Sequence, residues 1–130
     1  MSQTPIALNS KNPANAFTPT LVDAGGMLEV TNGGKSSALN LTAAAVIKGS
    51  SGRLAKIVII APGSTSGTFT FNDCATTGAA TAANTIFTLA YNATSNVAGS
   101  VFNVEWPCAN GIVLSAVPGG GSPIVAVSFA

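Results

Sequence analysis

The side chains that could perform acid–base chemistry are few and lie far apart in the sequence. The four carboxylates are Asp23, Glu29, Asp73 and Glu105, and histidine, the commonest general base and metal ligand, is absent. Folding could bring Asp73 and Glu105 within the ~5–10 Å that separates the carboxylates of a glycosidase. Glu105, however, alternates with apolar residues, so an exposed strand face explains it without chemistry. We therefore expect no catalytic residues and no enzymatic activity.

Nucleophilic, phosphate-binding and metal-binding motifs are also incomplete. No G-x-S-x-G elbow occurs, and Lys35 precedes Ser36 in a glycine-rich turn where the amine should be solvated. The glycine-rich residues 118–122 lack the G-K-[ST] ending of a phosphate loop. Cys74 and Cys108, without histidine, cannot complete a four-ligand zinc site. We interpret both cysteines as small buried side chains, leave a disulfide between them open, and expect neither metal nor cofactor.

Four other side chains offer weaker binding signals. Trp106 and Tyr91 could stack on a sugar or a base, but a single tryptophan at an inward position is more often part of the core. Arg53 and Lys56 begin a strand-like segment, where they are either solvated strand ends or rim contacts to an acidic partner. We favour the solvated interpretation. Glycosylation sequons occur at residues 40–42 and 92–94, and without a secretion signal we treat them as chance matches.

The composition restricts the partners that the chain can bind. It has 130 residues, enough for one domain, with 47% hydrophobic and only 7% charged residues and a net charge of +1. Such a balance provides neither the basic stripe of a nucleic-acid-binding protein nor the polybasic patch of a membrane-surface protein. No apolar run approaches the ~20 residues of a transmembrane helix, and the N-terminus lacks signal-peptide features, so we expect synthesis in the cytoplasm. The apolar surface is either mostly alanine or covered by other subunits, and we favour the second explanation.

Residues 49–71 carry the clearest structural pattern. An apolar run at 53–61, a Pro-Gly-Ser turn at 62–67 and an alternating stretch at 68–71 together predict a β-hairpin at the centre of the fold. Alanines 43–45 also favour a helix, but uncapped flanks and β-branched neighbours favour a strand there. Further strands are predicted at residues 27–31, 39–48, 85–91, 101–106, 112–117 and 124–130.

These elements predict an all-β domain. Seven or eight short strands separated by turns are typical of an antiparallel β-sandwich with a jelly-roll-like layout, here over residues 27–130. Residues 1–26, interrupted by prolines and by Gly25-Gly26, are predicted to form an extended N-terminal arm.

Alternation along the strands predicts which side chains are buried. Both faces of residues 57–60 are apolar, which is typical of a strand in the middle of a sandwich or of one covered by another subunit. In the segment 101–106, Phe102, Val104 and Trp106 are predicted to point inward. The core or interface candidates are Ile57, Val58, Ile59, Ile60, Phe69, Phe71, Phe102, Val104, Trp106, Val125 and Val127.

Three runs in residues 41–130 resemble small virion proteins of tailed bacteriophages, of the capsid-decoration (cement) and head-fibre kind. The runs are AAAVIKGSSGRLAKIVIIAPGSTSGTFTFND, CATTGAATAANTIFTLAYNATSNVAG and VFNVEWPCANGIVLSAVPGGGSPIVAVSF. The resemblance implies a non-enzymatic structural protein that forms homotrimers, binds the major capsid protein and resides on the virion head. The alternative is a fibre or adhesin-type module that presents residues 72–84 and 92–100 to a host-surface glycan.

Overall fold

The computed structural model of the chain describes residues 10–11, 17–18, 34–119 and 123–130. The chain divides into two compact units, Met1–Thr31 and Asn32–Ala130. In the first unit, β1 (Ser10–Lys11) pairs antiparallel with β2 (Phe17–Thr18). The predicted strand at 27–31 and the predicted end of the arm at residue 26 lie outside the described residues. No helix within the described part of the chain is long and apolar enough to span a membrane.

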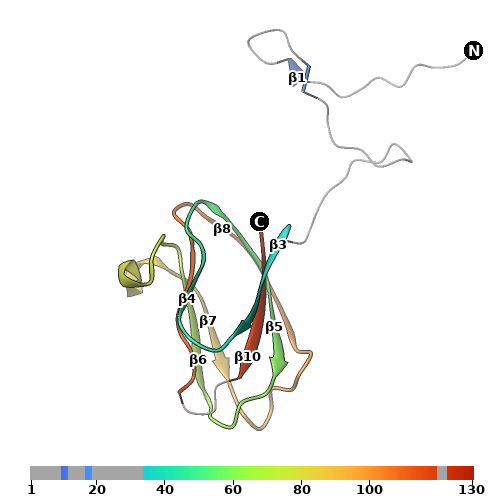
Figure 1. Cartoon of the computed structure of the whole chain (residues 1–130), viewed down its shortest axis with the longest axis vertical. Helices are drawn as coiled ribbons and strands as arrows, with labels where there is room; N and C mark the ends of the chain where they lie inside the picture. Colours follow the sequence, from blue (N-terminus) through green and yellow to red (C-terminus); the bar gives the residue numbers. More distant parts are fainter. Residues whose placement is uncertain (1–9, 12–16, 19–33, 120–122) are drawn as a thin grey trace, which may run out of the picture. The chain divides into compact units, whose positions relative to one another are not determined.

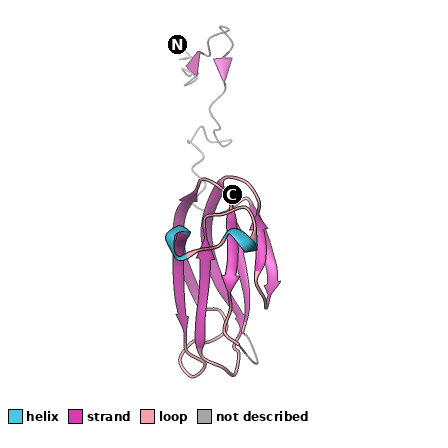
Figure 2. Ribbon diagram, turned by 90° about the vertical axis from the view of Figure 1, so that its left-hand side faces the viewer, coloured by secondary structure: helices cyan, strands magenta, loops and turns pink. Residues whose placement is uncertain are grey.

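The second unit is a sandwich of two four-stranded antiparallel sheets, as the all-β prediction expects (Figures 1 and 2). One sheet, here the β5 sheet, has the order β3-β10-β5-β8, and the other, the β6 sheet, has the order β4-β9-β6-β7. The strands are β3 (Ser36–Leu41), β4 (Ala45–Lys48), β5 (Gly52–Ala61), β6 (Gly67–Asn72), β7 (Thr85–Tyr91), β8 (Val101–Cys108), β9 (Ile112–Ala116) and β10 (Ile124–Phe129). Two single 3-10 turns, η1 (Thr77–Ala79) and η2 (Ala82–Asn84), lie between β6 and β7.

The core lies between the sheets and follows the predicted alternation. Phe69 of β6 and Tyr91 of β7 meet edge to face, with ring centroids 6.2 Å apart. Phe102 and Val104 are partly buried against the core. Six of the predicted core residues belong to the fully packed cluster: Ile57, Ile59, Phe69, Phe71, Val125 and Val127.

The predicted central hairpin is wrong, although both of its strands exist. β5 pairs with β10 and β8, whereas β6 pairs with β7 and β9, so the two strands belong to different sheets. In a hairpin, Ile59 and Phe69 would lie side by side on one face. By crossing between the sheets at residues 62–66, the chain instead places both in the same core from opposite sides, which buries both fully.

The predicted strand at 39–48 is two strands. β3 and β4 lie in different sheets, and the chain crosses between the sheets at residues 42–44. Asn40 adopts a positive φ of 54°, and the register between β3 and β10 shifts at this point. The extra residue separates Leu39 from Leu41: Leu41 packs against the core, whereas Leu39 is 64% exposed. The strand assignment is therefore right, and the continuous alternation across it is wrong.

The inward position predicted for Trp106 is also wrong. β8 continues through Pro107 to Cys108, which an edge strand tolerates because it has only one neighbour to bond. Glu105 adopts a positive φ of 50°, and the pairing with β5 changes register between Leu54 and Lys56. Beyond this irregularity Trp106 lies at the rim of the sheet and is 53% exposed.

The crossing between β5 and β6 is fixed by one buried hydroxyl. The Tyr91 Oη atom accepts a hydrogen bond from the Gly63 backbone N–H at 2.7 Å and donates one to the Gly63 carbonyl oxygen at 3.1 Å. Tyr91 is 2% exposed, so its ring fills the core and is not available for stacking on a ligand.

Substitution Tyr91→Phe tests this anchor. The ring and its packing remain, but both bonds to Gly63 are lost, so we expect a loss of about 1–3 kcal/mol in the free energy of unfolding. Urea denaturation followed by circular dichroism measures the loss. Thr88→Val, which removes an exposed hydroxyl from the same strand, should change stability by less than ~0.5 kcal/mol. Equal stability of wild type and Tyr91→Phe would contradict the role assigned to this hydroxyl.

Candidate functional site

The Asp73 carboxylate accepts hydrogen bonds from three backbone N–H groups. It follows β6, and its Oδ2 atom accepts a hydrogen bond from the N–H of Ala109 (2.9 Å), while Oδ1 accepts from Asn110 (2.7 Å) and Gly111 (3.1 Å). Desolvation of the carboxylate raises its pKa, but these bonds together outweigh it, and the pKa of Asp73 is lowered. Asp73 is therefore an ionised clamp that fixes the β8–β9 turn. A general acid needs the opposite, a raised pKa.

Glu105 is engaged separately, on the outer side of the β5 sheet. Its carboxylate lies 3.3 Å from the guanidinium of Arg53, and the two side chains are 37% and 34% exposed. Arg53, Lys56, Asn103 and Glu105 line a shallow hollow of about 510 Å³. An ion pair this exposed contributes little to stability. The two candidate carboxylates thus serve different parts of the fold, and Asp23 and Glu29 lie outside the described residues.

Both cysteines are buried and neither forms a disulfide. The Cys74 Sγ atom donates to the Thr76 carbonyl oxygen at 3.3 Å, and burial raises the pKa of the Cys108 thiol. This confirms the interpretation as small buried side chains. Among the described residues, no group of three or more His, Cys, Asp or Glu side chains is placed to hold a metal ion.

The outer surface of the β5 sheet carries an apolar row that no described strand or turn covers. Because Ile57 and Ile59 face the core, Val58 and Ile60 must face outward. Val58 is paired with Val101 on one side and with Ala126 on the other, so these three side chains cross the sheet in a line. We define the outer face as Leu39, Val58, Ile60, Val101, Ile124 and Ala126.

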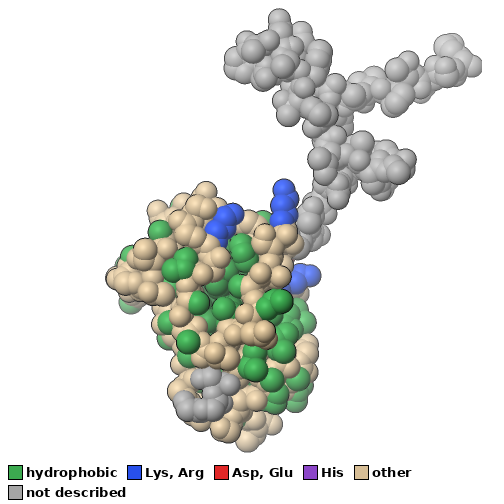
Figure 3. Space-filling model, viewed as in Figure 1, with side chains coloured by type: hydrophobic (Ala, Val, Ile, Leu, Met, Phe, Trp, Pro, Cys, Tyr) green, Lys and Arg blue, Asp and Glu red, His purple; other side chains and the backbone are tan. Residues whose placement is uncertain are grey.

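Three of the six residues of the outer face are exposed, whereas Ala126 is 9% exposed, and charge is confined to one end of the sheet. Leu39, Ile60 and Val101 are 64%, 47% and 53% exposed. Figure 3 shows hydrophobic side chains gathered along the lower part of the flank formed by β5 and β10, with the visible lysine and arginine side chains at the other end. The exposed aliphatic side chains therefore lie away from the charged end of the sheet (Figure 3).

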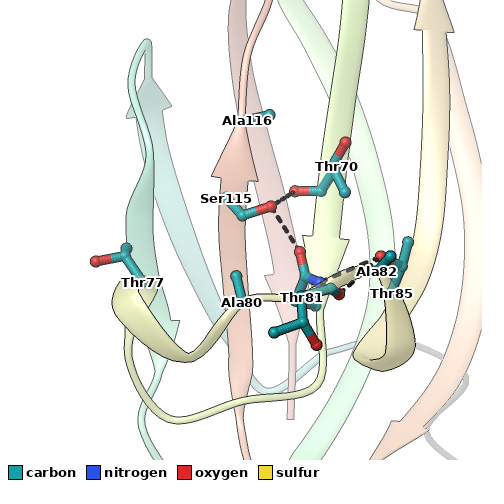
Figure 4. A pocket seen from close by; sticks show the side chains of 9 residues that line it. Thr70, Thr77, Ala80, Thr81, Ala82, Thr85, Ser115 and Ala116 are labelled. Carbon is teal, nitrogen blue, oxygen red and sulfur yellow. Dashed lines mark hydrogen bonds between the residues drawn. The ribbon is translucent and has the colours of Figure 1, made fainter.

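A polar groove lies on the outer side of the β6 sheet, where η1 and η2 lie against β6 and β9. Its volume is about 480 Å³. Figure 4 shows strand residues at the back of the groove and the segment between β6 and β7 in front. The lining consists of Thr70, Asn72, Ser115 and Ala116 from the strands and Thr77, Ala80, Thr81, Ala82 and Thr85 from the segment.

The back of the groove is held by the buried amide of Asn72. Its Nδ2 group donates to the Thr81 carbonyl oxygen and the Asn84 Oδ1 atom, both at 2.8 Å, and more weakly to the Thr85 hydroxyl at 3.2 Å. Its Oδ1 atom accepts from the Ser115 hydroxyl at 2.6 Å. This network connects η2 directly to the sheet, and the Asn84 side chain connects η1 by donating to the Ala79 carbonyl oxygen at 2.9 Å, so the groove is preformed.

No protein-family model, curated protein or solved structure matches the chain. Inference about function therefore depends on the outer face, the groove and the resemblance noted above. Sequence reasoning named Val58 and Ile60 of the outer face and the segment 72–84 of the groove. It missed Thr70 and Ser115, because a lone hydroxyl in a strand carries no signal until its neighbour across the sheet is known.

Substitution Asp73→Asn tests the clamp. The amide oxygen can still accept from Asn110 and Gly111, but the amide NH₂ would face the Ala109 N–H, donor against donor. We expect a loss of about 1 kcal/mol in unfolding free energy at pH 7, at the low end for bonds to a charged group because water reaches this carboxylate.

The pH dependence gives the matching control. Because the folded-state pKa of Asp73 lies below its unfolded value, its stabilisation is present above about pH 4 and is lost as the pH falls through the folded pKa. Urea denaturation of both proteins from pH 7 to pH 2 should therefore show the stability difference shrinking below about pH 4. A difference that stays constant with pH would contradict the ionised clamp.

Proposed function

We propose that this chain is a non-enzymatic structural protein that self-associates and decorates or cements a bacteriophage capsid. The uncovered outer face of the β5 sheet is the observation that carries the proposal. The low charge of the chain and its resemblance to phage virion proteins support it. The second copy of the chain and the major capsid protein are the proposed partners, and the virion head surface is the proposed location.

Burial of the outer face would contribute the binding free energy. Removing apolar surface from water is worth about 25 cal/mol per Å², so covering the exposed half of a side chain such as Ile60 or Val101 contributes on the order of 1 kcal/mol. A second copy suits this surface, because a flat aliphatic sheet face packs well against another at the spacing of stacked sheets. The Arg53–Glu105 pair lies at the other end of the sheet and would remain solvated at the rim.

The small size of the outer face explains why a lattice would be its setting. A standard stable interface buries about 800 Å² per partner, more than six aliphatic side chains offer. One contact between two copies is therefore weak. Copies already held on a capsid would experience each other at high effective concentration, where weak contacts add up. The resemblance implies three copies around one axis, and sedimentation would count them.

Substitutions Ile60→Lys and Val101→Lys test self-association. Each places a charge that would have to be buried in the interface, so we expect the self-association constant to fall at least about tenfold. Sedimentation velocity across a series of protein concentrations measures it, and co-sedimentation with phage heads measures capsid binding. Both variants should lose both properties.

Thr88→Lys provides the matched control, since it adds the same charge to an exposed position of the β6 sheet. It should associate like the wild type. Thermal unfolding of each variant verifies that the monomer is intact. A wild-type protein that stays monomeric at every concentration and does not co-sediment with heads would refute the proposal, as would unchanged association of both outer-face variants.

A further inference from the structure

We infer that the groove between β6, β9 and the two 3-10 turns binds a neutral polyhydroxylated ligand, of the class of a saccharide unit. The groove lies on the β6 sheet, and the proposed interface lies on the β5 sheet. The inference therefore stands independently of the proposed function.

The charge of the lining selects a neutral ligand. Threonine, serine, asparagine and alanine make up the whole lining, without any acidic or basic side chain. A phosphate, carboxylate or amine that entered would lose water without gaining an opposite charge, which is costly. The neutral hydroxyl groups of a ligand lose less hydration free energy, and the hydroxyl groups of the groove can replace their hydrogen bonds to water.

The chemistry of the lining matches the two-sided character of a sugar ring. Each threonine offers a methyl group and a hydroxyl, so apolar and hydrogen-bonding surface alternate along the groove, as C–H and O–H groups do around a pyranose. No hydrogen bond among the described residues engages the hydroxyls of Thr70 and Thr77. Each such hydroxyl can donate one bond and accept two.

The backing of the groove is rigid, which lowers the cost of binding. The Asn72 amide forms hydrogen bonds with Thr81, Asn84 and Ser115. These bonds hold the walls of the groove in place, and they leave the amide with no unpaired group to offer a ligand. A volume of about 480 Å³ lies in the range of small-molecule sites. Aromatic side chains are absent from the lining, so stacking adds nothing, and we expect a dissociation constant on the order of 1 mM.

Titration of the full ¹⁵N-labelled chain tests the inference by NMR. The probes are the methyl glycosides of glucose, galactose and N-acetylglucosamine, with glucuronate and inorganic phosphate as charged comparisons. At least one neutral glycoside should produce saturable shifts in the amides around Thr70, Thr77 and Ser115, and the charged probes should bind more weakly. Dextran tested in the same way distinguishes a sugar within a polymer from a free sugar, since either can supply this chemistry.

Variants connect binding to the groove. Thr70→Val and Thr77→Val keep side-chain volume but remove one hydroxyl each, and each should weaken binding about tenfold, the loss expected of one hydrogen bond. Ala82→Arg places a long cation in the groove from an exposed position and should abolish binding. Thr68→Val, the same substitution on β6 outside the groove, should leave binding unchanged.

Three results would overturn the inference. The first is that no neutral glycoside and no dextran produces a saturable chemical-shift change. The second is that the shift changes centre on residues away from the groove. The third is that glucuronate or phosphate binds more tightly than the neutral probes. Groove variants should leave the sedimentation behaviour unchanged, and outer-face variants should leave saccharide binding unchanged. Failure of one proposal is thereby distinguishable from failure of the other.

Discussion

The alternate burial of side chains between two sheets is the constraint on which the rest of this structure depends. Each sheet contributes one row of large apolar residues, and neither row is buried without the other. Ile57 and Ile59 need the aromatic pair Phe69 and Phe71 opposite them, and the crossing at residues 62–66 supplies that arrangement directly. The positions of the outward side chains follow from it. Val58, Ile60 and Thr70 face solvent because their neighbours in sequence face the core.

The two outward surfaces differ in chemistry, although both are nearly uncharged. The β5 sheet presents aliphatic side chains, whereas the β6 sheet presents hydroxyls and methyl groups beside a segment of small residues. A sandwich separates such surfaces by the thickness of its core, so each can change without disturbing the other. The few charged groups that the structure describes are used locally: Asp73 fixes a turn, and Arg53 pairs with Glu105.

The sequence was sufficient to predict the fold class, most strand positions and half of the core. Alternation is a local property, and it held in β6 and β7. Sheet membership is a property of partners far along the chain, so β5 and β6 were wrongly paired across a short turn. The positive φ at Asn40 shifted the alternation of β3 by one residue and left Leu39 exposed, and Asn40 is not a glycine that would have signalled it. Trp106 is exposed beyond the register change at Glu105, although its partner Leu54 is fully buried. Neither exposure could be predicted.

The position of β10 has a consequence for how the molecule reaches its native state. β10 lies between β3 and β5, and Ala130 exchanges two backbone hydrogen bonds with Arg53. Residues 36–41 and 52–61 therefore have no ladder joining them until residues 124–129 arrive between them. The β5 sheet closes through contacts that span most of the domain, which makes it a late and slow step of folding. Until that step, the edges of β3 and β5 that face β10 have no hydrogen-bonded partner, and unpaired strand edges of this kind favour aggregation.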